Sequence, residues 1–336
     1  MGATLGKMIS PKLFSAARTI REDQVTLILE EYKSVEFEIL SLSKMTRPQA
    51  PVVISVIKNE LNIIAEFLSH YRELGVEKFA FIDNGSEDGT VEFLSSQDDV
   101  DLYKVIKPFS TLRKQAWINL LIKTYAENWI IYVDADEHIV FDDLRFEYKL
   151  PDLARFMDRL GVRRVRGCLV DMYGSFLIPE ASGEPRALTE VCPFFDKSGY
   201  NEYQLLQFIS REGGIRQRIF RDISAEFRPQ LTKYPMFRLD DRELFTNPHY
   251  LWPYEPNFKS DCFLGILHFK FLPNFMSKTE TAIIEGGYWK NSFEYRCYKE
   301  LLVRDGNIPL CENITAVYEG PSSLTAHNII SPIFKD

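Results

Sequence analysis

The feature that most constrains this sequence is a repeated alternation of short apolar runs and longer amphipathic segments, which begins at Pro51. The apolar runs lie at 52–57, 78–82, 101–106 and 129–133, and the first of them, VVISVI, is continuously apolar and rich in β-branched residues. The segments between them carry apolar residues at helical spacing and lie at 59–75, 90–96 and 112–128. Buried parallel strands have continuous apolar sequences, and strands that alternate with helices build parallel sheets. The alternation therefore predicts an α/β fold with a doubly wound, mostly parallel sheet and helices on both faces.

The rest of the chain is less regular. Residues 1–50 form an appendage that fits one or two strands or an irregular wrap, and the prolines of TRPQAP separate it from the regular alternation. The second half predicts a helix at 151–161, strands at 163–176, 213–222 and 265–272, and a late helix at 285–306. A long polar loop is predicted at 179–200.

The composition limits the classes of protein to which the chain can belong. Its 336 residues suit one large domain or two small ones, and an apolar content of 45% can build a core without disulfides. A net charge of −8 makes the chain a poor generic binder of nucleic acid or anionic lipid. Five scattered cysteines without a CxxC pair indicate reduced thiols in a cytoplasmic protein. No segment reaches the roughly 18 apolar residues of a membrane span, and no signal peptide is evident. These patterns do not test peripheral contact with a membrane.

An acidic triplet follows the fourth predicted strand. Asp134 and Asp136 flank Ala135 directly after the apolar run IIYV, where neighbouring carboxylates repel one another and are costly to desolvate. A divalent cation would offset this repulsion, and oxygen ligands favour Mg²⁺ or Mn²⁺. A solvated acidic turn is the alternative explanation. The position after a buried strand of an α/β sheet favours the metal site, because ligands bind beyond the carboxyl ends of such strands.

Polar clusters also follow the first two predicted strands. Asn59 and Glu60 stand where the first strand ends, and Asp83 opens the loop DNGSEDGT after the second. Contacts to a nucleoside are one interpretation of these residues. Helix capping and turn formation are the other.

The combination of these motifs resembles the nucleotide-sugar-binding half of family 2-like glycosyltransferases with the GT-A fold. The resemblance rests on VIKNELNIIAEFLSHYRELGVEKFAFIDNGSEDGT and WIIYVDADEHIVF, and it extends through VDMYGSF, GGIRQRIF and GILHFKF over residues 51–302. It implies a donor-binding half at 51–150, an α+β acceptor-side half of the same domain at 151–310, and a tail at 311–336. It also implies an inverting, metal-dependent transferase that uses a nucleotide-diphospho-sugar, with a UDP-sugar favoured.

The resemblance also assigns roles to individual residues. Asp134 and Asp136 would bind Mn²⁺ or Mg²⁺, with His268 as a further ligand or as a structural histidine. The donor would contact the residues at the strand ends and one lysine after His268: Asn59, Glu60, Asp83, Asp134, Ala135 and Lys270. The acceptor would be a glycan or a lipid-linked glycan, as in the synthesis of surface polysaccharides.

The catalytic base is the least constrained assignment. Inverting transfer needs a carboxylate that takes the proton of the acceptor hydroxyl. Asp171 is the first choice, and the rivals are Glu190, Asp222 and Glu226, because the Glu-Asp or Asp-Asp pair of many family 2 enzymes is not evident. In the predicted strand 213–222, Arg216 and Arg218 would share one face. That face would hold a diphosphate or an anionic acceptor, or would simply be solvated.

Two other functions compete with glycosyl transfer. A haloacid-dehalogenase-like phosphatase would use Asp134 as its nucleophile, but its Asp-x-Asp motif normally follows the first strand rather than the fourth. A glycosyltransferase-like module could also bind a nucleotide sugar or a glycan without turnover. A dinucleotide dehydrogenase is disfavoured because no GxGxxG follows the first strand.

Overall fold

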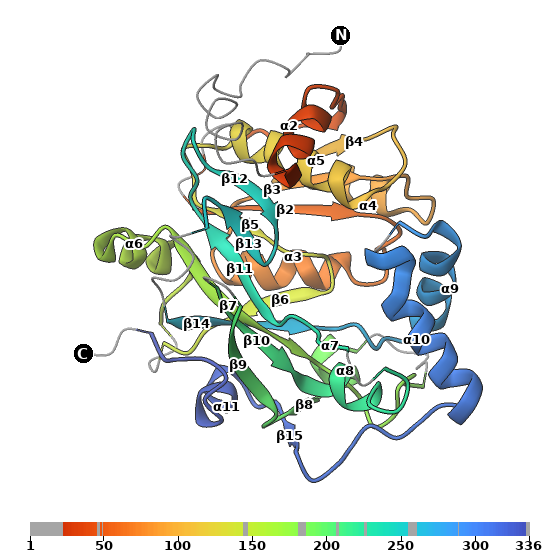
Figure 1. The fold of residues 1–336 in the computed structure, drawn as a ribbon. Helices are drawn as coiled ribbons and strands as arrows, with labels where there is room; N and C mark the ends of the chain where they lie inside the picture. The colour runs from red at the N-terminus through yellow and green to blue at the C-terminus, as the bar shows by residue number, and fades with distance from the viewer. Residues whose placement is uncertain are drawn as a thin grey trace. The chain divides into compact units, whose positions relative to one another are not determined.

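The computed structural model describes residues 23–45, 48, 50–143, 147–180, 186–205, 208–224, 227–254, 261–287 and 289–333 (Figure 1). The chain divides into two compact units, which are described separately. Unit 1 comprises 1–135, 147–165 and 234–260, and unit 2 comprises 136–146, 166–233 and 261–336. The predicted segment boundaries at 50, 150 and 310 stay predictions.

Unit 1 contains the predicted alternation of strands and helices. Its strands are β1 (Glu38–Ser41), β2 (Val52–Ile57), β3 (Lys78–Asp83), β4 (Val100–Lys104), β5 (Ile130–Tyr132), β12 (Leu244–Asn247) and β13 (Tyr250–Trp252). Its helices are α2 (Asp23–Tyr32), α3 (Ile64–Glu73), α4 (Thr90–Ser95), α5 (Thr111–Thr124) and α6 (Leu150–Leu160). Strands β7 (Arg164–Asp171) and β11 (Thr232–Phe237) contribute residues to both units.

The sheet of unit 1 is mixed and mostly parallel. Its strand order is β1-β4-β3-β2-β5-β11, with parallel pairing from β4 to β5. β1 and β11 pair antiparallel at the two ends of this row. This arrangement confirms the α/β class and the four predicted parallel strands.

Alternate residues of β3 show that helices cover both faces of this sheet. Ala80 and Ile82 belong to a buried cluster with Trp117 of α5. The intervening residue Phe81 packs against Phe67 of α3, with 5.9 Å between the ring centroids. Because successive strand residues point to opposite faces, α5 and α3 lie on opposite sides of the sheet.

The N-terminal prediction was wrong in part. The segment that fitted strands or a wrap begins with helix α2, and only Glu38–Ser41 forms a strand. Val25, Ile28, Leu29 and Tyr32 are buried, and their spacing is that of one helix face. The helical period was therefore present in the sequence, but the mixed apolar pattern around it obscured it.

Unit 2 is built around a shorter sheet. Its strands are β6 (Glu137–Val140), β8 (Phe194–Asp196), β9 (Tyr200–Leu205), β10 (Phe208–Gly213), β14 (Cys262–His268) and β15 (Thr315–Val317). Its helices are α7 (Leu188–Val191), α8 (Gly214–Ile219), α9 (Phe275–Glu285), α10 (Trp289–Asp305) and α11 (Pro321–Ala326). β14 pairs in parallel with β7 and antiparallel with β6, whereas β9–β10 and β8–β15 form separate antiparallel pairs.

The predicted strand at 213–222 is wrong, because helix α8 occupies most of it. β10 ends at Gly213, whose φ is +123° and whose Cβ, if present, would lie 1.8 Å from the Gly199 carbonyl oxygen. Only glycine fits this turn from strand to helix. The alternation of arginine with other residues in IRQRIF resembles the two-residue period of a strand. In the structure, Ile215 of α8 and Phe220 at its C-terminal end are buried in the core of unit 2.

The late helix predicted at 285–306 is confirmed in its main part. Helix α10 ends at Asp305, but Lys290, Asn291 and Ser292 have non-helical backbone angles near its start. Helix α9, which follows β14, was not predicted.

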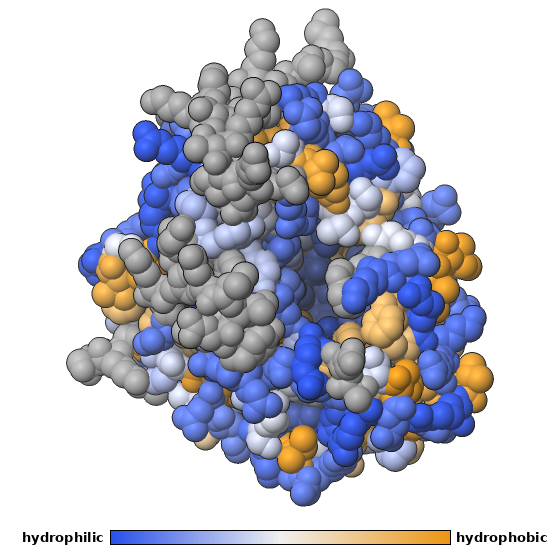
Figure 2. Space-filling model, in the orientation of Figure 1, coloured by the Kyte–Doolittle hydropathy of each residue, from blue (hydrophilic) through white to orange (hydrophobic). Residues whose placement is uncertain are grey.

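The surface view is largely hydrophilic where it is coloured, with hydrophobic side chains in small separate groups (Figure 2). Exposed apolar residues such as Ile284 and Val303 lie on α9 and α10. Single exposed apolar residues are normal and need no partner to explain them. Among the helices that the structure describes, none has the length and apolar character needed to cross a bilayer.

Candidate functional site

Three strands of unit 2 bring the main candidate residues into one row. In the register of β14, the partner of His268 is Asp171 on β7 and Glu137 at the start of β6. Asp136 joins them because its carbonyl oxygen accepts a hydrogen bond from the Phe269 amide at 2.8 Å. β7 and β14 are parallel and both end at this row. The row therefore lies at the sheet edge where α/β proteins bind ligands.

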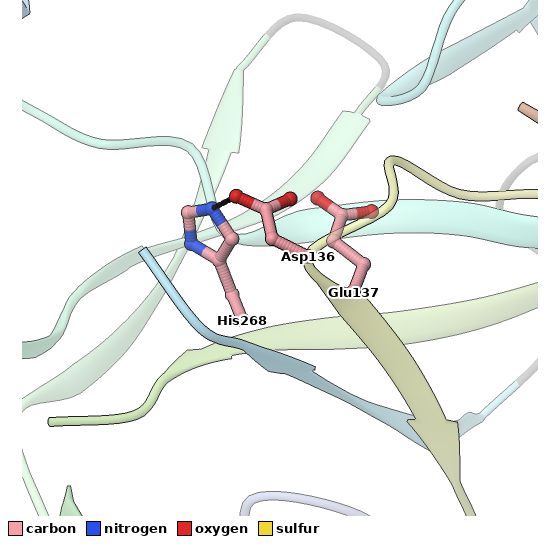
Figure 3. A group of neighbouring side chains, drawn as sticks. All are labelled: Asp136, Glu137 and His268. Atoms are coloured by element: carbon pink, nitrogen blue, oxygen red, sulfur yellow. Dashed lines mark ion pairs between the residues drawn. The ribbon is translucent and has the colours of Figure 1, made fainter. Parts of the chain in front are cut away.

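Asp136, Glu137 and His268 form a group that could hold a cation. One ligand atom from each residue lies within 4.8 Å of the others. Figure 3 shows the Asp136 carboxylate directed at the imidazole, where Oδ2 lies 3.5 Å from His268 Nε2. Carboxylate oxygens suit Mg²⁺ and Mn²⁺, and an imidazole nitrogen shifts the preference toward a transition metal. This set of donors fits Mn²⁺ better than Mg²⁺.

Each of these groups has a further charged partner. His268 Nδ1 lies 2.6 Å from Asp171 Oδ1, and Arg216 Nε donates to Asp171 Oδ2 at 2.7 Å. Glu137 forms a buried ion pair with Lys233. Metal-binding histidines usually donate their second N–H to a carboxylate, which fixes the ring. The contacts around His268 match that pattern.

The charges set the protonation of the site. Burial lowers the pKa of His268, but Asp136 and Asp171 outweigh it and raise this pKa to about 9. Burial raises the pKa of Asp136, but the positive charge of His268 holds it well below its usual range. Burial opposes ionisation of Asp171 as well, and Arg216 with His268 holds its pKa well below the usual range. Without a metal, the site is thus an imidazolium between two carboxylates.

The raised pKa of His268 predicts a pH-dependent contribution to stability in the absence of metal. An unfolded histidine titrates near pH 6.5, so this contribution is complete below about pH 6.5 and is lost as the pH rises through about 9. We expect the stability advantage of wild-type protein over His268→Gln to shrink by on the order of 3 kcal/mol between about pH 6 and pH 10. Urea denaturation in EDTA, at both pH values, measures the difference in the free energy of unfolding between the two proteins. A pH-independent difference would contradict the charged arrangement.

Lys270, the predicted donor-phosphate ligand, lies beside a second acid. Its Nζ is 3.1 Å from Glu294 Oε1, and the Arg216 guanidinium lies 3.4 Å from the same carboxylate. Tyr298 donates its hydroxyl hydrogen to Glu294 at 3.1 Å. Burial raises the pKa of Glu294, but Lys270 and Arg216 outweigh it and lower this pKa to about 2. Glu294 therefore links Lys270 to Arg216 as an ionised carboxylate.

The contacts of Asp171 argue against its predicted role as the catalytic base. Its side chain is 1% exposed, and both of its oxygens are bound, one by His268 and one by Arg216. A base must reach the acceptor hydroxyl and take up its proton. Among the rivals, Glu190 accepts a hydrogen bond from the Ala187 amide at the start of α7, and Asp222 is exposed. Glu226 lies outside the described residues.

The predicted pairing of Arg216 and Arg218 on one strand face is replaced by two separate ion pairs. Both residues lie on α8, where Arg218 Nη2 is 2.9 Å from Asp196 Oδ1. Arg218 also contacts Glu312 at 2.8 Å. Arg216 alone therefore reaches the row of residues around His268.

The other acid of the triplet lies in unit 1. Asp134 Oδ1 is 2.8 Å from Lys114 Nζ and accepts a hydrogen bond from the Tyr132 hydroxyl at 3.2 Å. Ala135 is buried. The predicted roles of Asp134 at a metal, at a donor, or as a phosphatase nucleophile stay predictions.

The two polar loops of unit 1 brace each other. The Asn59 amide N–H donates to Ser86 Oγ at 2.9 Å, and Asn59 Oδ1 accepts from the Glu87 amide at 2.8 Å. The Glu60 amide N–H donates to Thr90 Oγ1 at 3.0 Å. Asp83 accepts hydrogen bonds from the amides of the next loop residues, Gly85 and Ser86. These contacts give the loops a structural explanation, and the predicted nucleoside contacts of Asn59, Glu60 and Asp83 stay predictions.

Three charged residues near the site were missed by the sequence reasoning. Glu137 had no assigned role, although it directly follows Asp136. Lys233 and Glu294 carry no motif, and only folding brings them to Glu137 and Lys270. An acid after a buried strand is a usable signal, whereas isolated charges in an irregular half of a chain are not.

Comparison with protein-family models and with curated protein sequences found no significant match to this chain. The functional interpretation therefore depends on its own residues and their geometry.

Proposed function

We propose that the chain is an inverting, metal-dependent glycosyltransferase of the GT-A type. Its donor is a nucleotide-diphospho-sugar, with a UDP-sugar favoured, and its acceptor is a glycan or a lipid-linked glycan, as in surface polysaccharide synthesis. One observation carries the proposal: Asp136, the second acid of the Asp-x-Asp triplet, lies with Glu137 and His268 in a group able to hold a cation. The parallel strands of unit 1 and the motifs at their ends support the same fold type.

The residues of the site have distinct roles in this proposal. Asp136, Glu137 and His268 would hold Mn²⁺ or Mg²⁺. The bound ion would offset the negative charge that develops on the leaving nucleoside diphosphate. Lys270 would add a positive charge near the same group, balanced in the free protein by Glu294.

The residues of unit 1 would bind the nucleotide-sugar donor. Asp83, Asn59 and Glu60 are assigned to the nucleoside, and Asp134 with Ala135 to the ribose or diphosphate. The bracing of the two loops would hold these residues in a fixed arrangement before the donor binds.

A thermal-shift screen tests the proposal. UDP-, GDP-, CMP- and dTDP-sugars are added with and without Mn²⁺, and Asp136→Asn is the control. We expect one nucleotide to stabilise the protein only with Mn²⁺. At a concentration about 100 times Kd the stabilisation is about 2.7 kcal/mol, which raises Tm by several degrees.

Two outcomes would change the conclusion. No shift with any nucleotide sugar would contradict a donor site. Metal-dependent binding without hydrolysis or transfer across a panel of acceptors would identify a non-catalytic binding module instead.

A further inference from the structure

Asp171 is a buried member of the row of residues, and it touches both His268 and Arg216. We propose that Asp171 is a positioning residue that holds the His268 imidazole with Nε2 directed at Asp136 and available to a cation. The proposal rests on the metal site of the proposed function. It replaces the role of catalytic base that the sequence suggested.

The geometry fixes the imidazole through two successive contacts. Asp171 Oδ1 lies 2.6 Å from His268 Nδ1, while Arg216 Nε holds Oδ2 at 2.7 Å. The Arg216 side chain is 8% exposed and also lies 3.4 Å from Glu294. The Asp171 carboxylate therefore cannot turn away from the imidazole without breaking its buried contact with Arg216 Nε. The ring stays in the orientation that puts Nε2 at 3.5 Å from Asp136 Oδ2.

The same contacts select which ring nitrogen is free. An ionised carboxylate only accepts hydrogen bonds, so the proton of a neutral His268 must stay on Nδ1. The lone pair is then on Nε2, which is the ring nitrogen that lies 3.5 Å from Asp136 Oδ2. Asp171 thus sets both the direction of the ring and the tautomer that a metal ligand requires.

A second aspartate in the same unit provides a matched comparison. Asp196 is also buried, at 2% exposure of its side chain, and it pairs with Arg218 of the same helix α8. Asp196 accepts a hydrogen bond from the Tyr173 hydroxyl at 2.6 Å. Asp171 contacts His268 instead. Asp171 and Asp196 therefore share burial and an arginine partner, and differ in the group that they orient.

The substitution Asp171→Asn changes the tautomer with little change in volume. Arg216 can only donate, so the new amide oxygen turns to Arg216 and the new NH₂ group turns to His268. His268 must then accept at Nδ1 and carry its proton on Nε2, where it blocks coordination. We expect the affinity for Mn²⁺, measured by titration calorimetry on the full chain, to fall about 10- to 100-fold. Asp196→Asn should leave this affinity within about twofold of wild type.

A double-mutant cycle separates positioning from general damage to the fold. If Asp171 acts through the imidazole, then Asp171→Asn should change the Mn²⁺ affinity by less than about twofold in a His268→Ala background. An equal loss in both backgrounds would overturn the proposal, and so would an equal loss in Asp196→Asn. Wild-type protein that binds no Mn²⁺ would overturn both this proposal and the metal site of the proposed function. Wild-type binding that Asp171→Asn leaves unchanged would overturn this proposal alone.

A structure of the wild-type chain with Mn²⁺ gives a test that does not depend on the folding of any variant. We expect the ion on His268 Nε2, with the contact between Nδ1 and Asp171 retained. An ion bound by Nδ1, or by Asp171 directly, would overturn the proposal.

Discussion

Asp136→Asn should abolish metal-dependent donor binding and glycosyl transfer. The substitution removes the carboxylate that faces His268 Nε2 at 3.5 Å and leaves a neutral amide of the same shape. Loss of an outer partner of a metal ligand costs about 10- to 100-fold, so loss of a ligand itself should cost more than about 100-fold in Mn²⁺ affinity. Calorimetry with Mn²⁺ alone and a transfer assay with the donor found by thermal shift measure the two effects.

Asp134→Asn is the informative comparison, because both acids belong to one triplet. Asp134 contacts Lys114 and Tyr132, so it should affect the donor more than the cation. We expect Mn²⁺ affinity close to that of wild type in Asp134→Asn, together with weaker stabilisation by the donor.

For the first variant, Asp136→Asn, glycosyl transfer at the wild-type rate would remove the basis of the proposed function.

The sequence was sufficient to predict what depends on local periodicity. Strands β2, β3 and β5 are short, mostly apolar runs and helix α3 has a helical period, so each is visible within about 15 residues of sequence. The acids after β5 were recognised for a similar reason, since a carboxylate at the end of a buried strand is costly unless something offsets it. Asp136 came from that argument together with the family resemblance.

The sequence was not sufficient where contacts join distant residues. Glu137 meets Lys233, and Lys270 meets Glu294, through pairings that no local pattern encodes. Asp171 was singled out as the catalytic base, a role that needs a free carboxylate, because its partners on β14 and α8 could not be known from the sequence. Helix α8 was mistaken for a strand because Arg216 and Arg218 lie two residues apart, which is the spacing of residues on one face of a strand.

The largest effect on stability is expected for Arg216→Met. The Arg216 side chain is 8% exposed and pairs with Asp171 at 2.7 Å and with Glu294 at 3.4 Å. Methionine fills much of the space but leaves both carboxylates with less compensating charge. Breaking a buried ion pair by removing one partner costs about 3–5 kcal/mol in the free energy of unfolding. Urea denaturation at neutral pH measures this loss.

The pH dependence of the loss identifies its electrostatic cause. The lowered pKa of Asp171 stabilises the wild-type fold above the pKa of the unfolded state, near 3.9, and this contribution disappears as the pH falls further. Arg216→Met removes part of that contribution, so the difference from wild type should be largest at neutral pH and should shrink below about pH 4.

An exposed arginine supplies the control for Arg216→Met. Arg304 pairs with Asp305 at 2.6 Å, but its side chain is 44% exposed, so Arg304→Met should lower the free energy of unfolding far less than Arg216→Met does. A loss in Arg216→Met as small as that of the control would show that the buried carboxylates do not depend on Arg216. A loss that did not diminish at low pH would point to packing rather than charge. A large loss of stability at neutral pH that diminishes at low pH would show that charge holds Asp171 to Arg216. The same ion pair would then fix the orientation of His268 through Asp171.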